Sequence, residues 1–205
     1  MNTHRKIAAI FIAALAVLGI AGCSNSSKDS AADSLTLAWV VDPSWAQVPV
    51  ANDLGYFKQH GVNVKIVPFP TGAAALEALA GGAVDIANGG DVPTSAAALK
   101  NPNLRVFADG AIWPEGRFVA RRSAGINSIA DLAGRKIAVP LGSSAHYFAS
   151  RFLTEANVKA DLVQTGPAEI VTASTNHNVD AIAVFQPALA KAVAALGSDA
   201  VELQG

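Results

Sequence analysis

The sequence predicts an α/β fold whose sheets are rich in parallel strands and carry helices on both faces. From Leu35 onward, short apolar runs typical of β-strands alternate with longer amphipathic runs typical of helices. The alternation restarts at Arg117 and continues to the end of the chain. Because strands that alternate with helices usually form parallel sheets, the pattern indicates a sheet of this kind in each half.

Seven elements are predicted in the first half. In order they are a strand over Leu35–Val41, a helix over Trp45–His60, a strand over Val62–Val67, a helix over Gly72–Ala80, a strand over Val84–Ala87, a helix over Val92–Lys100 and a strand over Leu104–Ala111. Glycine or proline follows most of them, and neither residue continues a helix or a strand well.

The second half repeats the pattern with shorter elements. In order these are a strand over Arg117–Arg121, a short helix over Ser128–Leu132, a strand over Lys136–Pro140, a helix over Ala145–Ala156, a strand over Asp161–Gln164, a helix over Pro167–Asn176, a strand over Val179–Val184, a helix over Gln186–Leu196 and a strand over Ala200–Leu203.

One stretch occurs in similar form in both halves. Val84-Asp85-Ile86-Ala87 follows one predicted helix, and Val179-Asp180-Ala181-Ile182-Ala183 follows another. A Pro-containing loop and a further Ala-rich helix come after each. Chance similarity between Ala-rich segments is the alternative. A true repeat predicts two similar lobes with a cleft between them, with Asp85 and Asp180 in structural positions at strand starts.

The composition fits a folded chain without a metal or nucleic-acid site. The 205 residues include 15 Lys and Arg, 16 Asp and Glu and four His, which gives a formal charge of −1. That balance gives no electrostatic preference for nucleic acid or acidic lipid. A hydrophobic fraction of 51% excludes a disordered chain. A single Cys excludes a disulfide framework and Cys-rich metal sites.

The N-terminus has the features of an export signal. A basic start, His4-Arg5-Lys6, precedes an uninterrupted apolar run over Ile7–Ala21. That run is short for a membrane span, which needs about 20 residues, but it suits a signal peptide. Ile20-Ala21-Gly22-Cys23 resembles the lipobox of bacterial lipoproteins, which implies cleavage before Cys23 and lipidation of that residue. The alternative is a chance Cys at the end of an uncleaved anchor.

These features predict four segments. Residues 1–22 are a lipoprotein signal peptide, and residues 23–33, rich in Ser, Asn, Asp and Ala, are a flexible tether. Residues 34–115 form a first lobe and residues 116–205 a second. The predicted location is the extracytoplasmic face of the cell membrane, reached through the lipid anchor, and ATP-dependent enzymes are disfavoured there.

Candidate ligand groups lie in the loops that follow the predicted strands. Ligands of open parallel sheets bind outside the carboxyl ends of the strands, where most of these loops also begin a helix. A helix N-terminus presents free N–H groups and a partial positive charge, so it can bind an anion without Arg or Lys. Gly142-Ser143-Ser144 and Thr71-Gly72 offer this chemistry in matching positions. Simple N-capping by the Ser and Thr residues is the alternative.

Aromatic residues near these loops have two possible roles. Trp45 and Phe185 follow strand ends, so they can form a ligand wall or pack in the core, whereas core or hinge packing is favoured for Trp113 and Tyr147. Catalytic patterns are poor, because His146 has no carboxylate fixed near it and no G-x-S-x-G, GxGxxG or Walker loop occurs. The four His residues have no metal-ligand spacing. No catalytic residue, cofactor or metal is therefore expected.

Several stretches in the same order resemble one family. They are Leu54-Gly55-Tyr56-Phe57 with Gly61-Val62, the run from Phe69 to Leu79, Val84–Ala87, Gly90-Asp91-Val92-Pro93, the run from Ile129 to Val139, and Gly142-Ser143-Ser144-Ala145-His146. Together they resemble bacterial solute-binding proteins of ABC importers, in the taurine, aliphatic-sulfonate and nitrate group. The resemblance runs from about Leu35 to the chain end. It implies a two-lobed type II periplasmic-binding fold that closes on its ligand by a hinge motion.

The resemblance also implies a set of ligand-binding residues. The anionic head group is expected at the loops that contain Thr71, Gly72, Gly90, Asp91, Gly142, Ser143, Ser144 and His146. The tail of the ligand is expected against Asp42, Ser44, Trp45, Phe185 and Gln186. The family commonly has Trp, and often a carboxylate, before the Pro of the last loop, where this chain has Phe185-Gln186-Pro187. A cationic amine on the ligand therefore loses one partner, which Asp91 or Asp42 could replace.

The resemblance predicts a binding protein without catalysis. The expected function is capture of a small sulfonate or related anion for delivery to ABC permease subunits, by a lipid-anchored monomer. Binding of nitrate or of a thiamine-pyrimidine precursor is the alternative, and so is an enzyme of the same fold. Family members reach about three hundred residues, and their C-terminal segment returns to complete the first lobe. We therefore expect the first lobe of this chain to be incomplete.

Overall fold

The computed structural model describes residues 33–113 and 116–204. The signal peptide predicted over 1–22, Cys23 and nearly all of the predicted tether therefore lie outside the described residues. In the two described ranges, no helix combines the length and the apolar character that crossing a membrane requires.

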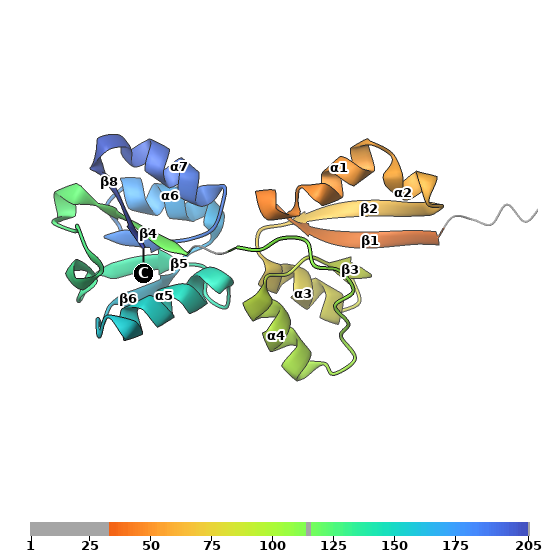
Figure 1. The fold of residues 1–205 in the computed structure, drawn as a ribbon, viewed down its shortest axis with the longest axis horizontal. Helices are drawn as coiled ribbons and strands as arrows, with labels where there is room; N and C mark the ends of the chain where they lie inside the picture. Colours follow the sequence, from red (N-terminus) through yellow and green to blue (C-terminus); the bar gives the residue numbers. More distant parts are fainter. Residues whose placement is uncertain (1–32, 114–115, 205) are drawn as a thin grey trace, which may run out of the picture. The chain divides into compact units, whose positions relative to one another are not determined.

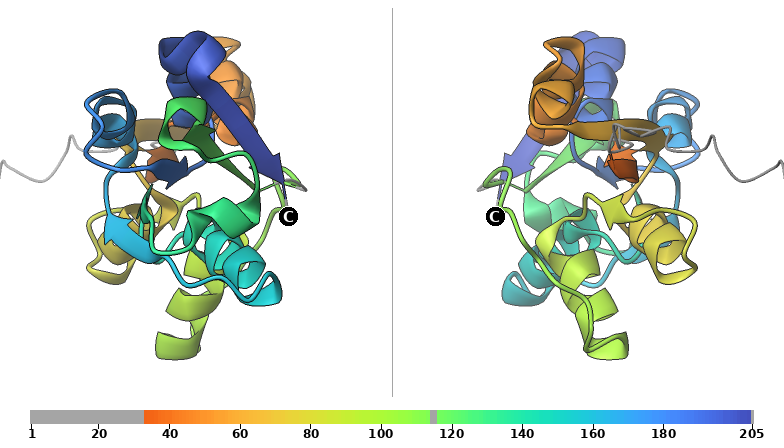
Figure 2. Two further views of the ribbon diagram at one scale, coloured as in Figure 1. Left: turned by 90° about the vertical axis from the view of Figure 1, so that its left-hand side faces the viewer. Right: turned by 90° about the vertical axis from the view of Figure 1, so that its right-hand side faces the viewer.

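The first half forms a small parallel sheet. Its elements are β1 (Asp33–Val40), η1 (Pro43–Trp45), α1 (Gln47–Asp53), α2 (Tyr56–Gln59), β2 (Val62–Phe69), α3 (Gly72–Ala80), β3 (Ile86–Ala87) and α4 (Asp91–Lys100). The strand order is β2-β1-β3, and both pairings are parallel. Leu37 is central to the register, because it pairs with Ile66 on one side and with Ile86 on the other. Helix α3 lies on one face of the sheet, and α1 and α2 lie on the other (Figures 1 and 2).

The second half forms a larger mixed sheet. Its elements are β4 (Arg117–Arg121), η2 (Arg122–Ala124), η3 (Ile129–Leu132), β5 (Lys136–Val139), α5 (Ser144–Glu155), β6 (Asp161–Gln164), α6 (Pro167–Thr175), β7 (Ala181–Ala183), α7 (Ala188–Leu196), η4 (Gly197–Asp199) and β8 (Ala200–Gln204). The strand order is β6-β5-β7-β4-β8. Strands β6, β5 and β7 are parallel, whereas β4 runs antiparallel to β7 and β8.

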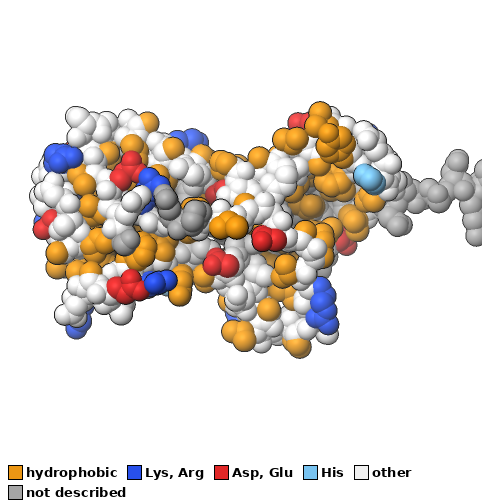
Figure 3. Space-filling view, viewed as in Figure 1, with side chains coloured by type: hydrophobic (Ala, Val, Ile, Leu, Met, Phe, Trp, Pro, Cys, Tyr) orange, Lys and Arg blue, Asp and Glu red, His pale blue; other side chains and the backbone are white. Residues whose placement is uncertain are grey.

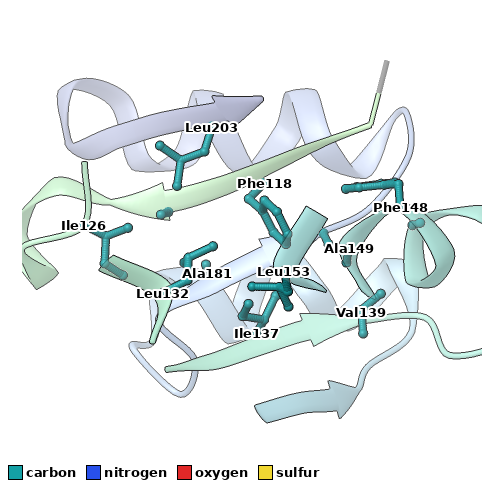
Figure 4. Close-up of a cluster of buried hydrophobic side chains, with 13 residues drawn as sticks. Phe118, Ile126, Leu132, Ile137, Val139, Phe148, Ala149, Leu153, Ala181 and Leu203 are labelled. Carbon is teal, nitrogen blue, oxygen red and sulfur yellow. The ribbon is translucent and has the colours of Figure 1, made fainter. Parts of the chain in front are cut away.

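The second sheet is buried on both faces, and the alternation of its side chains explains why. Phe118 and Ala120 of β4 belong to the cluster that packs with α5, shown in Figure 4. Val119, between them in the sequence, belongs to the cluster formed with α6 and α7. Successive side chains of a strand point to opposite faces, so a central strand covered on both sides is apolar throughout. Two helical layers thus hold in place the sheet whose loops carry Ser143, Ser144, Phe185 and Gln186 of the site described below.

The two halves share a hydrogen-bonding motif at the starts of their strands. The Asp85 carboxylate accepts a hydrogen bond from Thr36 N at 2.7 Å, and Asp85 N donates to the Thr36 carbonyl at 2.9 Å. In the second half, the Asp180 carboxylate accepts from Lys136 N at 3.0 Å, and Asp180 N donates to the Lys136 carbonyl at 2.9 Å. Each Asp therefore joins the start of one strand to its parallel neighbour, which agrees with their predicted structural role.

The helix ends before these two Asp residues are also alike. Gly82 follows α3 with φ of +72°, and His177 follows α6 at the matching position with φ of +61°. Left-handed backbone at this point ends a helix and turns the chain toward the next strand. The same turn with two different residues, followed by the same Asp motif, supports the internal repeat that the sequence suggests.

Three sequence expectations about the fold were wrong in detail. The helix expected over Trp45–His60 is divided into η1, α1 and α2, because Gly55 adopts φ of +72° and interrupts it. The strand expected over Leu104–Ala111 does not form, and among the described residues this segment has no strand beside it. Its apolar side chains are consequently exposed, Val106 by 72% and Phe107 by 77%. The antiparallel directions of β4 and β8 were not foreseen.

Replacing Asp180 with Ala is predicted to lower the free energy of unfolding by about 1 kcal/mol, because Lys136 N loses its acceptor. Asp180→Asn keeps an acceptor oxygen and should lose less. Asp85→Ala should have a similar effect in the first half. Urea denaturation followed by circular dichroism measures all three variants. An equal loss for Asp180→Asn and Asp180→Ala would instead assign the effect to charge.

Candidate functional site

A cavity of about 680 Å³ lies where the loops after β1, β3, β5 and β7 converge. Most of the residues singled out in the sequence line it. These are Asp42, Ser44, Trp45, Gly72, Gly90, Asp91, Ser143, Ser144, Phe185 and Gln186. The carboxyl ends of parallel strands and the helices that start there form the wall, as expected for an open α/β sheet.

Three of the candidate residues do not line the cavity. Thr71 caps α3, where its hydroxyl accepts a hydrogen bond from Ala74 N at 3.2 Å. His146 accepts one from Gly142 N at 3.2 Å through Nδ1, and Gly142 has φ of +75°. These contacts correspond to the capping alternative, because each one stabilises the start of a helix.

Other residues of the wall were not among the ligand-binding residues expected from the sequence. They are Val40, Gly89, Pro93, Thr94, Ser95, Val106, Ala108, Asp109, Ala111, Ile112 and Trp113. Six of them come from the segment between α4 and β4, and four of these six lie within the strand that the sequence analysis predicted over Leu104–Ala111. Side chains of a strand alternate between the two faces of a sheet, so the predicted strand did not indicate that these residues line a cavity. Trp113 packs edge-on against Phe148 of α5, with ring centroids 5.4 Å apart.

The start of α5 is held rigidly by its own capping residue. The Ser143 hydroxyl donates to the Pro140 carbonyl at 2.6 Å and accepts from His146 N at 3.3 Å. The side chain of Ser143 thereby fixes the turn between β5 and α5. Residues in the first turn of a helix have N–H groups without an intrahelical acceptor, so this end of α5 is a donor site at the cavity wall.

The hydroxyl of Ser144 is already engaged. It donates a hydrogen bond of 2.6 Å to a carboxylate oxygen of Asp91, the first residue of α4. The starts of two helices therefore share one carboxylate. A carboxylate is stabilised in that position because both helix N-termini carry partial positive charge.

Glycine at position 90 permits the close approach of these two helices. A Cβ placed on Gly90 would stand 2.7 Å from the Ser144 hydroxyl oxygen, closer than a carbon atom can approach without displacement. The absence of a side chain at this position thus brings the β3–α4 loop to the start of α5.

The Trp45 ring is held by the segment that carries Asp109. A Cβ placed on Gly110 would stand 2.7 Å from Cζ3 of Trp45. The Gly110 carbonyl also accepts a hydrogen bond from the Gln47 side chain at 3.4 Å. The indole N–H of Trp39 donates to the Trp45 carbonyl at 3.1 Å. The chain on both sides of Asp109 is therefore fitted against the aromatic wall.

The loop after β7 contributes an amide to the wall. The Gln186 side-chain oxygen accepts a hydrogen bond from Ala190 N of α7 at 3.2 Å, so its NH₂ group is the end available to a solute. The Gln186–Pro187 peptide bond is cis. Beside it, Phe185 offers an apolar surface and also packs against the core of the second half.

The charge of the wall is one-sided. Asp42, Asp91 and Asp109 line the cavity, and its lining contains no Lys, Arg or His among the described residues. Asp42 accepts a hydrogen bond from Ser44 N at 2.8 Å, which caps η1. Within the described ranges, no three His, Cys, Asp or Glu side chains form a group that could hold a metal ion.

Comparison with known proteins shows which proteins the chain is similar to. The model of the family described as NMT1/THI5 like matches residues 42–200. A protein of Escherichia coli (strain K12), provisionally named an aliphatic sulfonates-binding protein, is 33% identical over 125 residues, which cover 59% of this chain and 39% of that protein. The taurine-binding periplasmic protein of the same strain is 29% identical over 159 residues, 76% of this chain and 49% of that protein.

The fold agrees with this result. The alkanesulfonate-binding protein SsuA from Xanthomonas axonopodis pv. citri, solved with bound MOPS, superposes with a TM-score of 0.71 at 26% identity and covers 84% of this chain. This chain covers 61% of that structure, and less than half of the two curated relatives. The structural neighbours are type II periplasmic binding proteins, so the predicted fold class is confirmed.

Replacing Gly110 with Ala is predicted to displace Trp45, because the new methyl group would overlap the indole ring. The expected loss of stability is about 1–3 kcal/mol, typical of overpacking. The change in the tryptophan emission spectrum and in the urea midpoint measures it. Gly81→Ala is the matched control, since its methyl group would meet the carbonyl oxygens of Glu77 and Ala78 at 3.4 and 3.8 Å, which are ordinary contact distances. Similar spectra and midpoints for the two variants would contradict the close packing of Gly110 on Trp45.

Proposed function

The chain belongs to the NMT1/THI5-like family, and from this premise we propose that it captures a small sulfonate or related anion for an ABC importer. The solute is bound in the cavity between the loops of the two sheets and is then passed to permease subunits in the membrane. The relatives named above are binding proteins rather than enzymes, which supports binding without catalysis. The chain spans about half the length of these relatives or less, so the activity of the whole protein is part of the proposal.

The start of α5 is the observation that carries the proposal. Its capped first turn faces the cavity with Ser143 and Ser144, and no side-chain cation accompanies it among the described lining residues. An anion bound there is stabilised by oriented N–H groups and by the helix dipole. The tetrahedral oxygens of a sulfonate can accept several such hydrogen bonds together.

The Asp91–Ser144 hydrogen bond identifies what a bound anion must replace. Asp91 occupies the donor that a sulfonate oxygen would use. On binding, the solute therefore replaces the Asp91 carboxylate as the acceptor at the start of α5. The Asp91 side chain then turns toward the remainder of the cavity. The NH₂ group of Gln186 and the hydroxyl of Ser44 supply further donors at the wall.

The solute contacts proposed here come from both halves of the chain. Asp42, Ser44 and Trp45 belong to the first half, and Ser143, Ser144 and Gln186 belong to the second. A solute that binds both sets favours the arrangement in which they are close together. Differential affinity of this kind is the means by which a ligand stabilises a closed state, and a permease can then recognise that state.

The lipobox is the main support for the proposed location of the chain, which is the outer side of the membrane. Relatives are periplasmic by name, which supports an extracytoplasmic place for this chain. We propose that Cys23 is lipidated and that residues 24–33 tether the folded part to the outer side of the membrane. The folded part acts as a monomer in this scheme.

Ser144→Ala is predicted to weaken binding of an alkanesulfonate such as butanesulfonate, measured by isothermal titration calorimetry. Loss of one charge-assisted hydrogen bond corresponds to about 1.5–3 kcal/mol. A ligand at 100 times its Kd adds about 2.7 kcal/mol of stability, so thermal unfolding first identifies which of sulfonates, taurine, nitrate and thiamine precursors bind.

Ser150→Ala is the matched control for this experiment, because Ser150 lies on the same helix outside the cavity wall. It should leave the affinity unchanged. If no sulfonate raises the unfolding temperature, the proposed solute class is wrong. If Ser144→Ala and Ser150→Ala bind equally well, the start of α5 is only a capped helix end.

Cys23→Ala is predicted to abolish incorporation of a radiolabelled fatty acid in the native host, because the acceptor thiol is lost. Ser24→Ala, next to it, should be labelled normally. Without either substitution, the mass of the mature protein should also correspond to a chain that begins at Cys23. Equal labelling of the two variants would show that the lipid is not attached at Cys23.

A further inference from the structure

Residues 105–112, between α4 and β4, leave their backbone almost entirely unpaired. All eight residues are exposed. None of their N–H groups donates a hydrogen bond to a described residue, and Gly110 is the one residue among them whose carbonyl accepts a hydrogen bond from the described part of the chain. In Figure 1 the segment belongs to the irregular trace that follows α4. Exposed, unpaired backbone of this kind is a template for pairing with a strand of another chain.

The side chains of this segment alternate in the way that a strand requires. Arg105, Phe107 and Asp109 are charged or aromatic, whereas Val106 and Ala108 between them are small or branched and apolar. Paired as a strand, the segment would carry the two sets on opposite faces. Val106 and Ala108 line the cavity, whereas Phe107 is 77% exposed and lies outside the lining. A large apolar ring is therefore presented to solvent next to unpaired backbone.

The order of the charges makes the segment complementary to itself. Arg105 lies two residues before Phe107, and Asp109 lies two residues after it. If two copies pair antiparallel about Phe107, Arg105 of each copy stands directly opposite Asp109 of the other. Opposite charges and aromatic rings both form stabilising cross-strand pairs. A shift of two residues would place Arg105 opposite Phe107 or Ala111 and lose both ion pairs, so one register is favoured.

Both charged groups are available for such a pairing. Asp109 forms no hydrogen bond or ion pair with another described residue. Arg105 uses one guanidinium nitrogen, Nη1, to donate to the carbonyls of Pro102 and Leu104 at 2.8 and 2.9 Å. Its Nε and Nη2 donate to no residue in the described ranges, and these two nitrogens can bind a carboxylate.

We propose that two copies of this chain associate by antiparallel pairing of their residues 105–112, with two Arg105–Asp109 ion pairs and Phe107 on the two-fold axis. Each copy offers the same surface to the other, so the pairing closes after two copies and gives a dimer. The dimer is a second state of the chain, in equilibrium with the monomer of the proposed function. Its existence does not depend on which solute the cavity binds.

Oxidative cross-linking of a Phe107→Cys variant in cells of the native host tests the pairing. Residues directly opposite each other in an antiparallel pair have Cα atoms about 4.5–5.5 Å apart, within the range of about 4.4–6.8 Å that a disulfide spans. Copper phenanthroline should therefore give a covalent dimer on a non-reducing gel. Leu99→Cys, which is 89% exposed on α4 outside the segment, is the matched control. It should give no more dimer than the unmodified chain, which also contains Cys23.

Charge reversal in the Phe107→Cys variant tests the register. Arg105→Asp places two carboxylates opposite each other in both pairs, and Asp109→Arg places two guanidinium groups there. Each change should lower the yield of covalent dimer about tenfold, because opposite-charge cross-strand pairs become like-charge pairs. Combining both changes restores opposite charges in the same register and should restore the yield. Circular dichroism of the purified variants checks that they are folded.

Three results would contradict the proposal. The first is a dimer yield in Phe107→Cys that is no higher than in Leu99→Cys. The second is a yield that the single charge reversals leave unchanged, or that the double reversal does not restore. The third is a cross-linked product whose mass differs from that of two copies, because a different protein would then be the partner of the segment.

Discussion

The approach of Gly90 to Ser144 determines the geometry of the cavity. With a side chain at position 90, the loop after β3 could not reach the start of α5, because its Cβ would lie 2.7 Å from the Ser144 hydroxyl. The 2.6 Å hydrogen bond between Ser144 and Asp91 follows from that approach. Two helix N-termini, one from each half, thereby face the same space. The donors available to a solute are set by backbone packing, and cationic side chains are not needed to place them.

Much of the secondary structure could be predicted because local signals end each element. Gly72–Ala80, Arg117–Arg121 and Asp161–Gln164 have the predicted bounds. The exceptions depend on information that is not local. The segment 104–111 has the composition of a strand, but a strand forms only by pairing with a neighbour, and this segment pairs with none of the described strands. Hydrophobic side chains such as Val106 and Phe107 therefore lie exposed there. Figure 3 shows hydrophobic side chains at the surface on the face that it displays. The direction of β4 is set by its partners in the sheet rather than by its own residues.

The site was partly predictable from the order of the strands and helices. Loops at the carboxyl ends of parallel strands converge whatever their side chains are, so Asp42, Ser143 and Phe185 could be assigned to one wall from the order of elements alone. The sequence could not distinguish a capping hydroxyl from a ligand-binding one. Thr71 and Ser143 have equivalent signals and both cap a helix, yet only Ser143 also lines the cavity. Asp109 gave no signal, because its segment has the pattern of a strand and its place in the cavity wall depends on how that segment folds against Trp45.

The two halves are alike in backbone but different in charge, and this difference bears on selectivity. Both use an Asp to join neighbouring strands and end a helix with a left-handed residue. At the cavity, however, the first half supplies all three carboxylates, whereas the second supplies hydroxyls, an amide and an aromatic ring. Carboxylates repel anions in a partly enclosed site, so the first half disfavours an anion in the acidic part of the cavity. The donors at the start of α5 therefore mark the one part of the wall where a negative group is favoured, and the asymmetry of charge would set the orientation of a solute independently of the size of the cavity.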